Sequence, residues 1–146
     1  MGLINFIKEA GNKLFGEEEK ELDSNILKKH VETLGLDVEG LSISVDNEED
    51  KVSVYGKVST QENAEKVALA LGNVEGISVV DNKLKVVKPA PEARFHTVEK
   101  GDSLSLISKA VYGDAMKYNI IFEANKPMLK DPDLIYPGQV LRIPTI

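Results

Sequence analysis

The sequence predicts an α+β protein of two small modules, an αββαβ module followed by a βααβ module, with an amphipathic helix before the first. Apolar residues alternate between helical spacing and strand-like spacing along the 146 residues. A short segment with two prolines separates two such series of elements. A chain of this length has room for two modest hydrophobic cores, which support each other.

The composition excludes several classes of protein. Hydrophobic residues make up 42% of the chain and charged residues 29%, which is ordinary for a globular protein and unlike a disordered one. The chain has no cysteine, so it has neither disulfides nor thiolate metal sites. A net charge of −6 disfavours binding to nucleic acid. All the excess negative charge lies in residues 1–88, which therefore attract cations weakly.

The first 15 residues predict an amphipathic helix that Gly11 interrupts, because apolar side chains recur on one helical face at Leu3, Phe6, Ile7, Ala10 and Leu14. An acidic connection follows, and together the two make up residues 1–22. The start of the chain lacks the basic region, apolar core and cleavage site of a signal peptide. No window approaches the roughly 18 apolar residues of a membrane span. We therefore expect a cytoplasmic protein without a membrane span.

The first module is predicted to occupy residues 23–88. A helix begins at Asp23 or Ser24 and ends near Gly35. Period-two alternation over residues 41–45 and 52–58 predicts a hairpin. A second helix begins within the capping-box sequence of residues 59–62 and ends at Gly72-Asn73, before a strand over residues 77–87. The predicted order is helix, strand, strand, helix, strand.

The second module is predicted to occupy residues 95–146, after an extended linker over residues 89–94. A short strand over 95–98 precedes a helix that is capped near Ser103 and stopped by Gly113. Another helix follows over residues 114–125, and Pro127 limits its continuation. A turn at residues 136–139 leads to a final strand over 140–143.

Both modules resemble known families. The second resembles a LysM domain through Val98-x-x-Gly101-Asp102-Ser103-Leu104-x-x-Ile107-Ser108 and Ile135-x-Pro137-Gly138-Gln139-x-Leu141-x-Ile143-Pro144. The first resembles a BON domain through its element order, Val54-Tyr55-Gly56-Lys57-Val58, and Gly72-Asn73-Val74-Glu75-Gly76-Ile77. Over essentially its whole length, the chain is similar to the cytoplasmic bacterial potassium-binding proteins of the BON plus LysM type.

A potassium site needs a different donor set from a divalent site. Potassium is a large monovalent cation, and selective sites replace its hydration shell with neutral carbonyl oxygens. Clustered carboxylates favour divalent ions instead. Helix C-termini offer spare carbonyls, because their last four C=O groups have no partner within the helix. Two such segments are expected here, residues 7–11 and residues 72–77, and the glycines at 72 and 76 free the second backbone.

The resemblance implies six main-chain ligands and a role for them. The matching positions are Ile7, Lys8, Ala10, Gly72, Val74 and Ile77. It implies a monomeric intracellular potassium sensor or buffer, whose N-terminal helix docks when the ion binds. Rubidium and caesium are the expected substitutes for potassium. No nucleophile, base and orienting group form a pattern in the sequence, so no enzyme activity is expected.

A rival interpretation stays open at this point. LysM domains usually bind glycans that contain N-acetylglucosamine, and the matching loop positions here are Gly101, Asp102, Ser103, Leu104, Asn125 and Ile135. These residues predict an envelope protein that binds peptidoglycan. Likewise, an amphipathic helix at the N-terminus is by itself also compatible with docking on a core or on a membrane surface.

Overall fold

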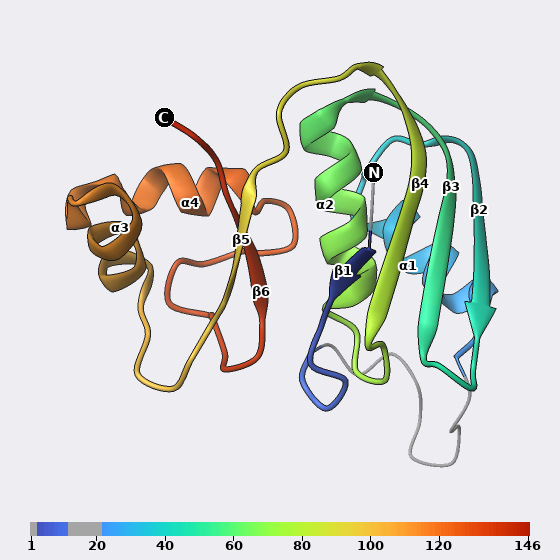
Figure 1. The fold of residues 1–146 in the computed structure, drawn as a ribbon, viewed down its shortest axis with the longest axis horizontal. Coiled ribbons are helices and arrows are strands. Elements are labelled where there is room, and N and C mark those ends of the chain that lie inside the picture. Colours follow the sequence, from blue (N-terminus) through green and yellow to red (C-terminus); the bar gives the residue numbers. More distant parts are fainter. Residues whose placement is uncertain (1–2, 12–21) are drawn as a thin grey trace.

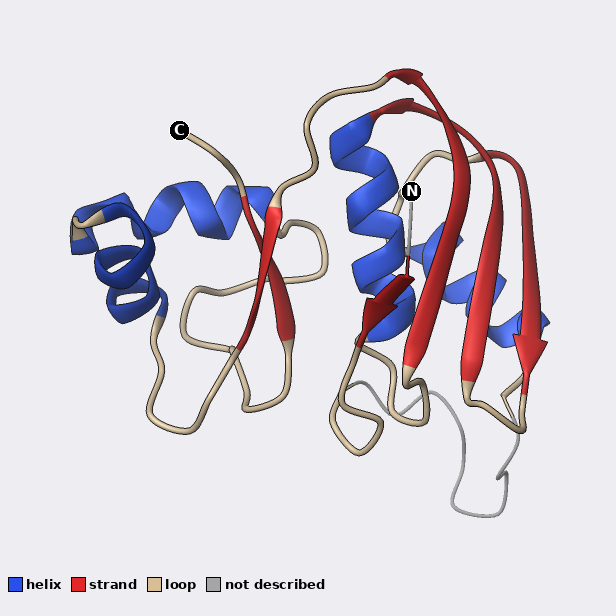
Figure 2. Ribbon diagram, viewed as in Figure 1, coloured by secondary structure: helices blue, strands red, loops and turns tan. Residues whose placement is uncertain are grey.

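The computed structural model describes residues 3–11 and 22–146. It is a mixed α+β fold with two sheets, as predicted from the sequence. One sheet has four strands in the order β1-β4-β3-β2, and the other has two strands, β5 and β6. Helix α2 lies between the two sheets (Figure 1, Figure 2). None of the helices in the described part of the chain is long and apolar enough to cross a bilayer.

The elements that build the four-stranded sheet and its helices follow the predicted αββαβ order. They are α1 (Ser24–Thr33), β2 (Glu39–Asp46), β3 (Lys51–Thr60), α2 (Gln61–Gly72) and β4 (Val79–Lys88). Strands β2 and β3 form an antiparallel hairpin, and β4 pairs in parallel with β3. The N-caps are Asp23 and Thr60, whose side chains accept hydrogen bonds from backbone N–H groups in the first turns of α1 and α2.

The predicted N-terminal helix is wrong over the described residues. Leu3–Asn5 form strand β1, which pairs antiparallel with β4, and a loop follows. Ile4 and Phe6 are the buried residues, at strand spacing, whereas Leu3 and Ile7 are exposed. A short apolar run fits both helical and strand periodicity. This run forms a strand because it pairs with the edge of β4. The predicted helical residue Leu14 and the acidic run lie outside the described residues.

The elements that build the second sheet and its helices follow the predicted βααβ order. They are β5 (Arg94–Thr97), α3 (Leu104–Tyr112), the 3₁₀ helix η1 (Ala115–Lys117), α4 (Tyr118–Ala124) and β6 (Val140–Ile143). Ser103 caps α3, and Gly113 ends it in the left-handed conformation. The single helix predicted over residues 114–125 is divided into η1 and α4.

Strand β6 is buried on both faces. Val140 packs into the hydrophobic core of the four-stranded sheet, whereas Leu141 and Ile143 pack into the core beneath α3 and α4. Alternate residues of a strand point to opposite faces, so β6 contributes to two cores at once. Helix α2 fills the space between the sheets, and nine of its twelve residues are buried.

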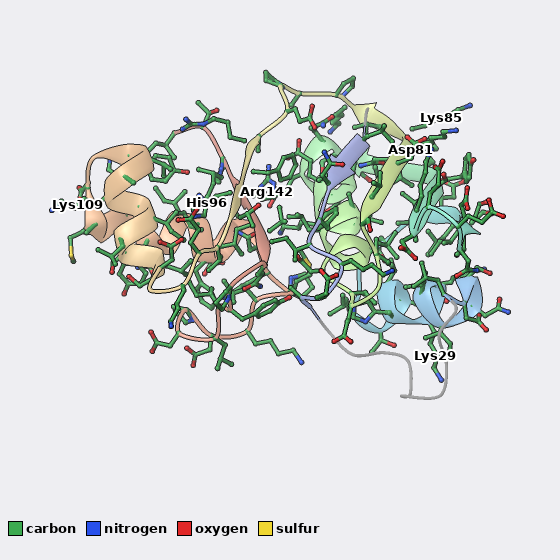
Figure 3. All side chains as sticks on the ribbon, turned by 60° about the horizontal axis from the view of Figure 1, so that its bottom comes forward. Lys29, Asp81, Lys85, His96, Lys109 and Arg142 are labelled. Carbon is green, nitrogen blue, oxygen red and sulfur yellow. The ribbon has the colours of Figure 1, made fainter. Side chains whose placement is uncertain are left out.

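A buried ion pair crosses the same boundary. Arg142 of β6 donates from Nε and Nη2 to Oε1 of Glu65 in α2, at 3.0 and 2.9 Å. Figure 3 shows Arg142 at the junction of the two sheets. The second oxygen of Glu65 accepts hydrogen bonds from the Gln61 amide and the Ala93 N–H. The carboxylate is therefore fully satisfied, which a buried charge requires.

Candidate functional site

The two segments that the sequence singles out, residues 7–11 and 72–77, lie side by side. In the structure, residues 7–11 form the N-terminal loop, and residues 73–78 form the α2–β4 turn that follows Gly72 at the end of α2. The Phe6 N–H donates to the Ser78 carbonyl at 2.8 Å, and the Gly76 N–H donates to the Lys8 carbonyl at 2.7 Å. Figure 1 shows the loop after β1 beside the turn that leads into β4. Main-chain groups from both segments therefore meet in one place.

Two glycines allow this close approach, and a third allows the conformation of the turn. A Cβ on Gly72 would lie 2.0 Å from Cζ of Phe6, so Gly72 makes room for a ring, and the sequence-based view that it frees the backbone is wrong. A Cβ on Gly11 would lie 2.3 Å from the Asn73 carbonyl oxygen, and the φ of Gly11 is +111°. Gly76 has φ +103°, a backbone conformation that favours glycine, as expected from the sequence.

The six predicted ligand residues are distributed over these segments and the end of α2. The carbonyls of Ile7, Lys8 and Ala10 belong to a loop, so they are not the helix C-terminal carbonyls that the sequence predicted. Gly72 is the last residue of α2, as predicted. Val74 and Ile77 belong to the α2–β4 turn, and both side chains are fully buried.

Hydrogen bonds within the site fix the directions of several carbonyls. The Ile7 carbonyl accepts from the Ala10 N–H at 3.1 Å, and the Val74 carbonyl accepts from the Ile77 N–H at 3.2 Å. The Gly76 N–H would be the next helical donor to Gly72, but it donates to the N-terminal loop instead. A carbonyl oxygen has two lone pairs, so one hydrogen bond still leaves capacity for an ion.

An ion pair ties the N-terminal loop to the β2–β3 hairpin. Lys8 Nζ lies 2.7 Å from Oδ2 of Asp50, and this hydrogen bond and charge raise the pKa of Lys8. Asp50 has φ +52° and accepts hydrogen bonds through its own carbonyl from Ser78 and Val79. The sequence does not predict this contact, because a run of acidic residues in a hairpin turn carries no sign of it.

The second sheet also reaches the site. Gly138, in the turn before β6, approaches the N-terminal loop so closely that a Cβ on it would lie 2.6 Å from the Ala10 Cβ. Asn73 uses its side-chain amide to bond both backbone groups of Val140. Neither contact has a signal in the sequence, because each depends on how the two sheets pack together.

The two segments offer neutral main-chain oxygens rather than a cluster of acidic side chains. Across residues 3–11 and 22–146, no group of three or more His, Cys, Asp or Glu side chains is arranged to hold a metal ion. Main-chain carbonyls of this kind suit a large monovalent cation better than a divalent one.

The residues of the rival glycan site have structural tasks. The Asn125 side chain is buried and bonds the backbone of Ile121 and Arg142. Leu104 is buried, and Ser103 caps α3. The Asp102 carboxylate accepts from the Glu99 N–H, which lowers its pKa, and from His96 Nε2 at 3.1 Å, which lowers it further.

A shallow surface cavity nevertheless lies beside these residues. Its volume is about 230 Å³, and it is lined by Ser103, Leu104, Ser105, Tyr118, Pro132 and Asp133. Gly101 lies in the turn that precedes α3, and Ile135 packs against the core below the helices. The structure therefore gathers only part of the predicted glycan set around a cavity.

Comparison with known proteins matches the two halves of the chain to two families. Residues 19–88 match the BON domain, and residues 96–144 match the LysM domain. An uncharacterized protein of Deinococcus radiodurans is 36% identical over 106 residues, which cover 65% of this chain and 41% of that protein.

A second relative matches from end to end. The Potassium binding protein Kbp of Escherichia coli O6:H1 is 48% identical over 149 residues, which cover 99% of this chain and 99% of that protein. Both domain matches fall within this alignment, in the same chain. The chain therefore belongs to the family of proteins with a BON and a LysM domain that includes Potassium binding protein Kbp.

Proposed function

We propose that this protein binds potassium selectively through the main-chain carbonyls of Ile7, Lys8, Ala10, Gly72, Val74 and Ile77, and serves as an intracellular potassium sensor or buffer. The observation that carries the proposal is the hydrogen bond from the Gly76 N–H to the Lys8 carbonyl, which joins the two carbonyl-bearing segments. Similarity to a protein named for potassium binding supports the choice of ion.

The arrangement suits an ion that acts as a clamp. Few hydrogen bonds hold the N-terminal loop to the α2–β4 turn. An ion that binds carbonyls of both segments would therefore strengthen this contact. A ligand at about one hundred times its dissociation constant stabilises the bound state by about 2.7 kcal/mol. That free energy adds to the hydrogen bonds that already hold the loop against the turn.

A titration with monovalent chlorides tests the proposal. Thermal unfolding is followed in potassium, sodium, rubidium and caesium chlorides at matched ionic strength. We expect the unfolding temperature to rise with potassium, and with rubidium or caesium, well above its value in sodium. Equal curves in potassium and sodium would remove the proposed function.

A pair of glycine variants locates the effect. In Gly11→Ala, the new Cβ meets the backbone of Asn73, so the loop cannot seat and the potassium response should disappear. Gly35→Ala is the matched control, because Gly35 also has positive φ but a Cβ on it would meet no other atom within 4 Å. We expect this control to lose some stability and to keep the potassium response.

A glycan-binding function is the second candidate, and the cavity beside Ser103 and Tyr118 favours it. Titration with an oligomer of N-acetylglucosamine tests it directly. Because Asn125 and Leu104 are buried in the core, we expect weak binding at most. Saturable binding that Tyr118→Ala abolishes would support the envelope function.

A further inference from the structure

Asp50 connects three segments around the proposed site. Its carbonyl accepts hydrogen bonds from the N–H groups of Ser78 and Val79, at 2.9 and 3.4 Å, where the α2–β4 turn enters β4. Its carboxylate holds Lys8 of the N-terminal loop at 2.7 Å. It is also the one non-glycine residue with positive φ among residues 3–11 and 22–146, at +52°. Asp50 thus has a backbone conformation that L-residues adopt rarely, at the point where these three segments meet.

Lys8 combines a proposed main-chain ligand with a positively charged side chain. Its carbonyl is one of the proposed ligands, and the same residue carries an ammonium group. A fixed positive charge near a cation site lowers the affinity, because like charges repel over several ångströms. The Asp50 carboxylate directs this ammonium group to the hairpin and offsets its charge at contact distance.

We propose that Asp50 is a positioning residue for the ion site, and that the Lys8–Asp50 pair sets the electrostatic potential that the bound ion experiences. This inference rests on the proposed potassium function. It assigns a signed role to each partner: Asp50 favours ion binding, and the Lys8 side chain opposes it.

Three variants test the two signs. Asp50→Asn keeps the side-chain shape and tolerates the backbone conformation, but leaves the Lys8 charge unpaired. We expect it to weaken potassium binding by about two- to tenfold, the range for charges near a protein surface. Lys8→Met leaves the Asp50 charge in place and should tighten binding by a similar factor. The double variant should return to within about twofold of the parent.

The control and the ionic-strength dependence separate charge from shape. Glu123→Gln removes a carboxylate from an exposed ion pair at the end of α4, Glu123–Lys126 at 3.0 Å, and should leave potassium binding unchanged. Choline chloride at increasing concentration should shrink the effects of both single variants, because salt screens exposed charges. Loss of a merely structural contact would not respond to salt in this way.

The outcomes distinguish this inference from the function on which it rests. Weakening in both single variants, or no change in either, would overturn the electrostatic role of the pair while the parent still binds potassium. A parent protein that does not prefer potassium over sodium in the same titration would remove the proposed function itself. Opposite shifts of the two single variants, with recovery in the double variant, support the inference.

Discussion

The side-chain amide of Asn73 pairs with both backbone groups of Val140: it donates to the carbonyl oxygen at 2.8 Å and accepts from the N–H at 2.9 Å. Asn73 stands between the proposed ligands Gly72 and Val74, whereas Val140 begins β6 of the LysM-matching region. One buried amide therefore connects the backbone of the proposed ion site to the second sheet.

Asn73→Ala should uncouple these two parts. Removing the amide leaves two buried backbone groups without partners, which costs about 1–3 kcal/mol of the free energy of unfolding. Chemical denaturation measures this loss, with Asn119→Ala as the control at an exposed position. If the variant is as stable as the control, the amide does not hold the sheets together.

The buried pair of Glu65 and Arg142 should behave differently from an exposed pair. Glu65→Gln leaves the buried guanidinium with only the exposed Glu62 carboxylate, 4.0 Å away, as its counter-charge, and breaking a buried pair costs about 3–5 kcal/mol. Replacement of both residues, as Glu65→Leu with Arg142→Met, should cost clearly less than either single change. Denaturation of Glu65→Leu, of Arg142→Met and of the double variant measures this, and additive losses would contradict it.

His30 should make stability depend on pH. Burial lowers the pKa of His30 below its ordinary value of about 6.5, although a hydrogen bond with the Ala70 backbone partly opposes the shift. The unfolded chain then binds more protons than the folded protein, so stability falls as pH drops below about 6.5. His30→Gln should flatten the unfolding temperature between pH 7 and pH 5.5 relative to the parent. Parallel profiles for parent and variant would exclude this origin.

Two tyrosines should respond in opposite directions to loss of the hydroxyl. Burial raises the pKa of Tyr136 to about 12, and no described residue gives its hydroxyl a hydrogen-bond partner. Tyr136→Phe should therefore stabilise the fold, by about 1 kcal/mol. Tyr112 donates to the Pro144 carbonyl, so Tyr112→Phe should destabilise it by about 0.5–1.5 kcal/mol. A loss of stability in Tyr136→Phe would contradict this account of its hydroxyl.

Most elements could be predicted because their signals are local. Asp23, Thr60 and Ser103 cap helices, and Gly113 ends one, so sequence spacing alone predicts these boundaries well. The N-terminal segment could not be predicted, because Ile4 and Phe6 are buried only through pairing with β4. A run this short has no periodicity of its own that decides between helix and strand.

The site could be predicted in part. Glycines and a helix end marked the α2–β4 turn, and resemblance supplied all six proposed ligands, which stay a prediction. The contacts of Asp50, Asn73 and Gly138 depend on the packing of distant segments. No local pattern reports that a hairpin turn contacts the N-terminal loop, or that both faces of β6 are buried.

The most direct test of potassium binding at this site follows the carbonyl carbons themselves. Carbon-13 NMR of the backbone carbonyls is recorded as potassium chloride replaces choline chloride at constant ionic strength, and again with sodium chloride. We expect potassium to produce the largest shifts at the carbonyls of Ile7, Lys8, Ala10, Gly72, Val74 and Ile77, and sodium at the same concentration to produce small ones. Shifts that cluster elsewhere in the chain, or that are the same for both ions, would contradict the proposed site.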